Sequence, residues 1–140
     1  MKRTLLLTVL ALASIAAQAN PTVESKGMLT SKDGRTLYTF DKDQAGKSNC
    51  TGGCIAAWPA FTVANSALAG GDFSIITRAD GAQQWAFKGM PLYFFAADAK
   101  AGDFGGDNQG GVWHVVRTAK KTSSRYETGE YSASYNYSYN

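Results

Sequence analysis

A short pattern that can do chemistry, Leu-Tyr-x-Phe-x-x-Asp, occurs twice and places a tyrosine five residues before an aspartate each time. A tyrosine hydroxyl beside a carboxylate can transfer protons, so a catalytic pair is one interpretation. In the structural interpretation, a buried tyrosine donates to the aspartate, or the aspartate caps amides of its own turn. We expect the structural role, with each pair holding the strand of one copy to the loop of the same copy. The motif residues are Tyr38, Phe40 and Asp43 in the first copy and Tyr93, Phe95 and Asp98 in the second.

The only two cysteines of the chain, Cys50 and Cys54, are the next candidates for chemistry. An even cysteine count in an exported protein predicts a disulfide. Because the closed loop is small, we expect the bridge to fix a turn rather than to contribute a large loop entropy. A redox-active pair is the alternative, although Cys-x-x-x-Cys differs from the Cys-x-x-Cys spacing of thioredoxin-like centres.

Candidate metal ligands stand mainly in the glycine-rich stretch after the second copy. Carboxylates in such a loop suit Ca²⁺, but their spacing does not match an EF-hand, and turn formation by Asp and Gly is the structural interpretation. His114 is the only histidine, and as a haem or copper ligand it would need Met28, Met90 or a cysteine nearby. We therefore expect no cofactor, with Ca²⁺ or haem as the alternative. The residues of this alternative site are Asp98, Asp103, Asp107 and His114.

Other familiar catalytic patterns are absent from the sequence. It contains no Gly-x-Ser-x-Gly, no credible Ser-His-Asp set and no phosphate-binding glycine loop after a strand. It also has no run of basic residues, so we expect no nucleic acid partner.

The elements that must position these residues are predicted to be short strands joined by tight turns. Asp33-Gly34 and Asp80-Gly81 lie between strand-like runs and favour hairpins, and the pattern gives about seven strands in all. One short helix is predicted over 54–58, ended by Pro59. The fold class is therefore mainly β: a small antiparallel β domain of two pseudo-symmetric repeats, with one short helix and a disordered C-terminal tail.

An internal repeat extends beyond the two motifs. Trp58 and Trp113 are separated by the same 55 residues as the tyrosines of the two motifs. A duplicated unit is the simplest explanation, with repeats over about 27–64 and 73–117 that pack as a pair.

The two copies also carry a family resemblance, in "LYTFDKD", "CTGGCIAAWPAF", "ITRADGAQQWAFKGMPLYFFAAD" and "GGVWHVV". Over residues 27–117 the chain resembles the bacterial "secreted repeat of unknown function" family, described as predicted lipoproteins with a Tyr-x-(Phe/Trp/Tyr)-x-x-Asp motif. The resemblance implies a secreted or envelope-attached β-rich module and no enzyme activity. The chain lacks the lipobox cysteine of the lipoprotein members, so we expect no lipid anchor.

The first residues, 1–19, have the features of a signal peptide. Lys2 and Arg3 precede a short apolar run, and a small-x-small site ends at Ala19. Cleavage after Ala19 would place a protein without a membrane span in the periplasm or outside the cell. Removal of two cations leaves 12 basic residues, from 14 Lys and Arg, against 11 acidic ones.

The remaining chain divides into a folded part and a tail. Residues 20–118 are predicted to form one β-rich domain. Residues 119–140 are rich in Tyr and Ser and hold no Leu, Ile, Val, Phe or Trp, which predicts disorder.

Together these features predict an exported, non-enzymatic β-rich envelope module with a structural or binding role. Its partner would be an envelope component or a small ligand that the sequence does not identify. The alternative is a periplasmic metal-, haem- or redox-binding protein that uses His114, the Cys50/Cys54 pair or the Asp-rich loop.

Overall fold

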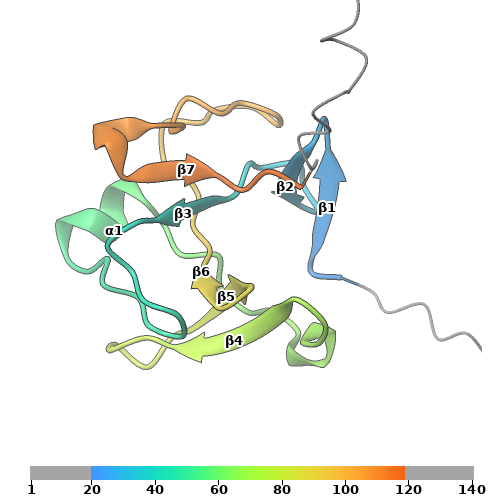
Figure 1. The fold of residues 1–140 in the computed structure, drawn as a ribbon, viewed down its shortest axis with the longest axis vertical. Coiled ribbons are helices and arrows are strands. Elements are labelled where there is room, and N and C mark those ends of the chain that lie inside the picture. Colours follow the sequence, from blue (N-terminus) through green and yellow to red (C-terminus); the bar gives the residue numbers. More distant parts are fainter. Residues whose placement is uncertain (1–19, 119–140) are drawn as a thin grey trace, which may run out of the picture.

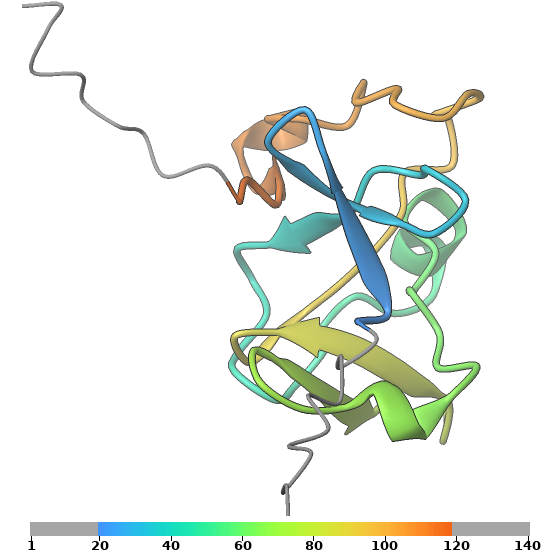
Figure 2. The same cartoon turned by 90° about the vertical axis from the view of Figure 1, so that its right-hand side faces the viewer.

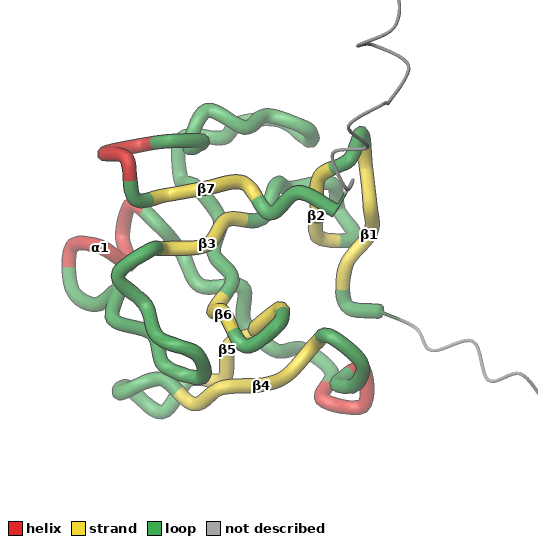
Figure 3. The backbone as a smooth tube through the Cα atoms, in the orientation of Figure 1, coloured by secondary structure: helices red, strands yellow, loops and turns green. Residues whose placement is uncertain are grey.

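The computed structural model describes residues 20–118, and the predicted signal peptide and tail lie outside that range. Within it, seven short strands form three antiparallel sheets, ordered β1-β2, β3-β7 and β4-β5-β6 (Figure 1). Loops occupy much of the chain between them (Figure 3). The predicted mainly β fold with one short helix is confirmed. The elements are β1 (Thr22–Ser25), β2 (Met28–Ser31), β3 (Tyr38–Phe40), α1 (Gly53–Ala57), β4 (Phe73–Thr77), β5 (Gln83–Phe87), β6 (Met90–Pro91) and β7 (Trp113–Val115), with 3₁₀ turns at Ser66–Leu68 and Gln109–Gly111.

Tight turns join neighbouring strands. The predicted Asp80-Gly81 turn connects β4 to β5, and Gly81 has a left-handed φ of 82° that suits glycine. The sequence did not predict the turn between β1 and β2. It is made by Lys26 (φ 50°) and Gly27 (φ 75°), where a lysine takes the left-handed position usually held by Asn or Asp.

The two repeats meet around a pseudo-twofold axis between Tyr38 and Tyr93. The Tyr38 amide donates to the Tyr93 carbonyl at 2.9 Å, and the Tyr93 amide donates to the Tyr38 carbonyl at 3.0 Å. On its other side Tyr38 pairs with Val115 of β7, while Tyr93 pairs with Ala60. The last strand of each repeat therefore lies beside the motif strand of the other repeat, so the repeats interlock.

Four aromatic rings stack across this axis, in the order Phe40, Trp113, Trp58, Phe95. Neighbouring ring centroids are 4.2, 3.9 and 4.4 Å apart, and the planes of the two tryptophans differ by only 3°. Both tryptophans are buried, at 7% and 5% exposure for Trp58 and Trp113. Because two rings come from each repeat, the stack is the centre of a core that neither repeat can complete alone.

A second core cluster lies on the opposite face of the motif strands. Leu37 and Leu92 each precede a motif tyrosine, so strand alternation points them to the other side, where they pack with Trp85. Figure 2 shows the β1-β2 hairpin, in blue, toward the viewer. Met28 of β2 forms an antiparallel bridge with Arg117, near the end of the described chain. None of the helices in residues 20–118 is long and apolar enough to cross a membrane.

Candidate functional site

The motif tyrosines and aspartates form two hydrogen-bonded pairs that cross between the repeats. The Tyr93 hydroxyl donates to Asp43 Oδ2 at 2.7 Å, and the Tyr38 hydroxyl donates to Asp98 Oδ2 at 2.5 Å. The expectation that each tyrosine binds the aspartate of its own copy is therefore wrong. Because β3 and the Tyr93 strand lie side by side around the axis, each hydroxyl meets the turn of the other repeat. We call these pairs the Tyr93–Asp43 clasp and the Tyr38–Asp98 clasp.

The second oxygen of each aspartate caps a loop of its own repeat. Asp43 Oδ1 accepts the Asn49 amide at 2.6 Å, and Asp98 Oδ1 accepts the Gly105 amide at 2.9 Å. Each carboxylate thus joins its own loop to the tyrosine of the other repeat. The two functions considered for the aspartates, hydroxyl acceptor and loop cap, occur together.

Burial sets the protonation of the clasps. Both tyrosines are fully buried, and this desolvation, together with the hydrogen bond to a carboxylate, raises the pKa of Tyr38 and raises that of Tyr93 to about 12. Burial also raises the pKa of Asp43, while the Asn49 amide, the Tyr93 hydroxyl and the charge of Arg78 act in the opposite direction. The tyrosines are therefore held as protonated donors.

A buried arginine that the sequence did not single out supports the Tyr93–Asp43 clasp. Ser48 Oγ lies 2.6 Å from the Tyr93 hydroxyl and accepts from Arg78 Nη1 at 2.8 Å. Arg78 Nη1 also donates to Gln84 Oε1 at 2.7 Å, and Nη2 donates to the Cys50 carbonyl at 2.6 Å. Only 4% of the Arg78 side chain is exposed, so the guanidinium group is almost fully buried.

Strand alternation is the signal that could have found this arginine. Arg78 stands two residues after Ile76, which is buried in β4, so the two side chains point to the same face. Arginine is otherwise mostly found exposed, so its charge alone gives no reason to place it in the core. Ser48 carries no comparable signal, because its partners Arg78 and Tyr93 lie 30 and 45 residues away in the sequence.

The predicted disulfide between Cys50 and Cys54 is confirmed. Cys50 is fully buried and belongs to the core cluster that contains Trp58, while Cys54 packs against that cluster. The bridge spans the turn that leads into α1, which ends before Pro59 as the sequence predicts. It therefore fixes the loop whose Asn49 amide and Cys50 carbonyl bond to Asp43 and Arg78.

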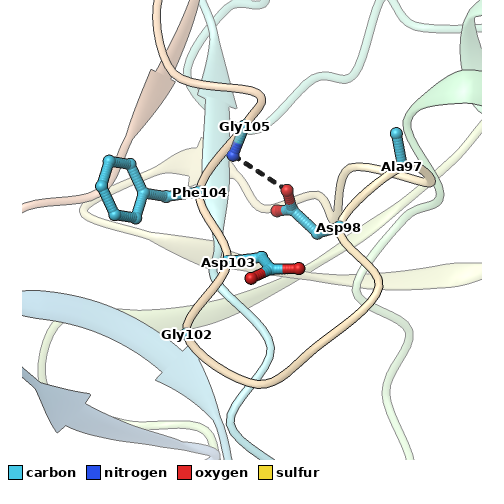
Figure 4. A pocket seen from close by; sticks show the side chains of 6 residues that line it. All are labelled: Ala97, Asp98, Gly102, Asp103, Phe104 and Gly105. Carbon is cyan, nitrogen blue, oxygen red and sulfur yellow. Dashed lines mark hydrogen bonds between the residues drawn. The ribbon is translucent and has the colours of Figure 1, made fainter.

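The acidic loop of the second repeat uses its carboxylates to bind its own backbone. Asp103 Oδ2 accepts the amides of Ala99 and Lys100, at 3.1 and 2.9 Å. Asp98 and Asp103 line a hollow of about 420 Å³, and Figure 4 shows the Phe104 ring pointing away from both carboxylates. Both carboxylates beside this hollow therefore accept hydrogen bonds that hold the loop in shape.

The other two residues of the alternative metal site have different partners. Asp107 accepts the Val115 amide at 3.0 Å and pairs with Arg117, whereas His114 Nε2 lies 2.8 Å from Asp41 Oδ2. Asp98, Asp103, Asp107 and His114 are therefore not brought together as one ligand set. Among residues 20–118, no group of three or more His, Cys, Asp and Glu side chains could hold a metal ion.

These features define a class of protein: a β-rich domain of two interlocked repeats, in which a tyrosine of each repeat donates a hydrogen bond to an aspartate of the other. The chain belongs to the family described as a secreted repeat of unknown function, whose model matches residues 22–62 and again 74–117. The two matched stretches contain the two copies of the motif. Comparisons with the curated proteins and with the solved structures gave no match.

Proposed function

We propose that the chain is an exported, non-enzymatic β-rich module of the cell envelope, released by cleavage after Ala19, with a binding or structural role. The observation that carries this proposal is the crossing of the two tyrosine–aspartate pairs. Their hydroxyls and carboxylates are used to join the repeats, and both tyrosines are fully buried. A general acid or base must reach its substrate and titrate near the working pH, and the two motif tyrosines, which are buried and have raised pKa values, do neither.

Tyrosine titration separates this proposal from catalysis by a tyrosine–aspartate pair. The chain has seven tyrosines, and absorbance at 295 nm reports their ionisation. We expect two of the seven to ionise only well above pH 10 or on unfolding, and Tyr38→Phe with Tyr93→Phe to remove that late phase. A motif tyrosine that ionises near neutral pH would contradict the structural role.

Measurements of thiols, bound metal and bound haem separate the proposed function from the metal-, haem- or redox-binding alternative. The chain is purified from an oxidising compartment, and its free thiols, absorption spectrum and bound metals are measured. We expect masked thiols that a mild reductant leaves masked, no Soret band and no stoichiometric metal. A Soret band or one equivalent of metal would overturn the proposal. An amino terminus other than Asn20 would contradict the cleavage site.

A further inference from the structure

The buried arginine that supports the Tyr93–Asp43 clasp also forms part of a pocket. This Arg78 pocket has a volume of about 350 Å³ and is lined by Ser48, Thr51, Gly52, Ile55, Arg78 and Asp80, among others. Its volume is at the lower end of those that hold small ligands. A nearly fully buried cation thus meets an opening whose other walls are exposed or half-buried.

The guanidinium has unused hydrogen-bonding capacity. It carries five N–H donors. Three donate within residues 20–118, to Ser48, Gln84 and the Cys50 carbonyl. Arg78 Nε lies 3.8 Å from Asp80 Oδ2, which is beyond hydrogen-bond distance. Two donors of a buried cation are therefore left without a close acceptor in the described part of the chain.

The neighbouring carboxylates do not fill this position. Asp80 is 65% exposed and accepts the Ala82 amide at 3.0 Å, so it belongs to its own turn. Asp43 is separated from Arg78 by Ser48 and Tyr93, which carry the hydrogen bonds between them. The charge of Arg78 is therefore balanced by an ion pair with the exposed Asp80 at 3.8 Å and by the nearby charge of Asp43, with no direct hydrogen bond to either carboxylate.

We propose that the Arg78 pocket binds a singly charged carboxylate, with its two oxygens on the free guanidinium donors and its alkyl part beside Ile55. A planar carboxylate matches the donor geometry of a guanidinium. A phosphate dianion would bring two charges to one cation and would be repelled by Asp80 at the rim. This inference gives a ligand class to the proposed binding role. It can fail while the clasps keep their structural role, because Asp80 is not part of either clasp.

The test is a titration of the ¹⁵N-labelled protein with sodium acetate, with sodium chloride exchanged to keep the ionic strength constant. We expect saturable shifts of the amides of Thr51, Gly52 and Ala79, with a Kd on the order of millimolar. Asp80→Asn removes the competing carboxylate, and its amide oxygen can still accept the Ala82 amide. It should tighten acetate binding by about two- to fivefold.

Asp72→Asn is the matched control, since it makes the same charge change at an exposed carboxylate that pairs with Lys88 instead. It should leave the acetate Kd unchanged. The site is rejected if neither the wild type nor Asp80→Asn shows saturable shifts, or if both Asn variants change the Kd equally. Tighter binding of phosphate than of acetate would overturn the carboxylate class.

A peptide pair distinguishes the two sources of such a carboxylate. Acetyl-dialanine presents a peptide chain end, and acetyl-dialanine amide lacks the charge. Tighter binding of acetyl-dialanine than of acetate would assign a peptide carboxyl terminus, and equal or weaker binding would assign a small organic acid. Equal binding of the amide would overturn the proposal. If the tyrosine titration fails as well, the proposed function itself falls.

Discussion

The two clasps occupy equivalent places in the two repeats, yet different chemistry holds each of them. The Tyr93 hydroxyl contacts Ser48, which is bonded to the buried Arg78, and its aspartate is only 8% exposed. The Tyr38 hydroxyl instead accepts the Gly106 amide at 3.3 Å. One clasp thus rests on a side-chain network and the other on the backbone.

The loops beside the clasps differ in the same way. The loop of the first repeat is closed by a disulfide. The loop of the second repeat is instead closed by Asp103, whose carboxylate accepts the amides of Ala99 and Lys100 in the same loop. A Cβ at Gly106 would lie 2.7 Å from the Trp58 ring, so the backbone can approach there only because the residue is glycine. Gly106 follows Gly105, whose amide bonds to Asp98. The equivalent residue of the first repeat is Cys50, which follows the Asn49 whose amide bonds to Asp43.

A comparison of the two loops shows which part of the duplicated unit both repeats share. The tyrosine, the aspartate and the capped loop amide keep one geometry in both repeats, although the first loop reaches its amide after six residues and the second after seven. The groups that contact the two tyrosine hydroxyls differ, with Ser48 and Arg78 on one side and the Gly106 amide on the other. Within residues 20–118, the buried cation beside a pocket lies on the side of the Tyr93–Asp43 clasp.

The largest expected effect on the free energy of unfolding comes from the aromatic stack that the two repeats share. Trp58→Ala and Trp113→Ala should each lower the free energy of unfolding by about 3–5 kcal/mol, because each removes a buried ring from the central stack. Guanidinium unfolding monitored by circular dichroism measures this. If either variant unfolds like the wild type, its tryptophan is not in a common core.

Removal of the disulfide should act on one loop only. Cys50→Ala with Cys54→Ala should cost about 2 kcal/mol, because the closed loop is small. Hydrogen exchange should quicken at Asn49, whose amide bonds to Asp43, and remain slow at Gly105, its counterpart. Equal acceleration at both amides would show that the loops are not independently held.

The two hydroxyls should differ in what they contribute. Tyr93→Phe should cost about 2 kcal/mol, because it leaves Oδ2 of the buried Asp43 carboxylate without the hydroxyl donor. Tyr38→Phe should cost about 1 kcal/mol, because the half-buried Asp98 can be hydrated. Urea unfolding at pH 7 compares them. A larger cost for Tyr38→Phe would reverse the proposed ranking of the clasps.

The smallest effect is a dependence on alkaline pH. The pKa of Tyr93 is raised by burial from 10.0 to about 12, so its contribution to stability is complete below pH 10 and is lost as the pH rises through 12. By pH 11 the advantage of the wild type over Tyr93→Phe should shrink by about 1 kcal/mol. Unfolding curves at pH 9 and pH 11 test this, and a constant difference would contradict the burial of the hydroxyl.

Local features of the fold could be predicted because their causes are local. The Asp80-Gly81 turn, the short helix before Pro59 and the bridge between Cys50 and Cys54 each follow from residues close in sequence. The duplication was visible because the copies share one spacing. The first hairpin was missed because Lys26 takes a left-handed conformation that its residue type does not favour.

The partners of the motif residues could not be predicted in the same way. Tyr93 and Asp43 are 50 residues apart, and a sequence spacing does not say whether a hydroxyl turns to its own loop or to that of the other repeat. The interlocking of strands decides this, and it is a property of the pair of repeats. The buried position of Arg78 likewise depends on Ser48 and Cys50, which meet it only in the folded chain.

Double-mutant cycles test the crossing of the clasps most directly. Phenylalanine replaces each tyrosine and asparagine replaces each aspartate, singly and in pairs, and the free energy of unfolding is measured at pH 7. We predict a coupling of about 1 kcal/mol for Tyr93 with Asp43 and for Tyr38 with Asp98, and additivity within about 0.5 kcal/mol for Tyr38 with Asp43 and for Tyr93 with Asp98. Coupling within the repeats and additivity across them would contradict the account.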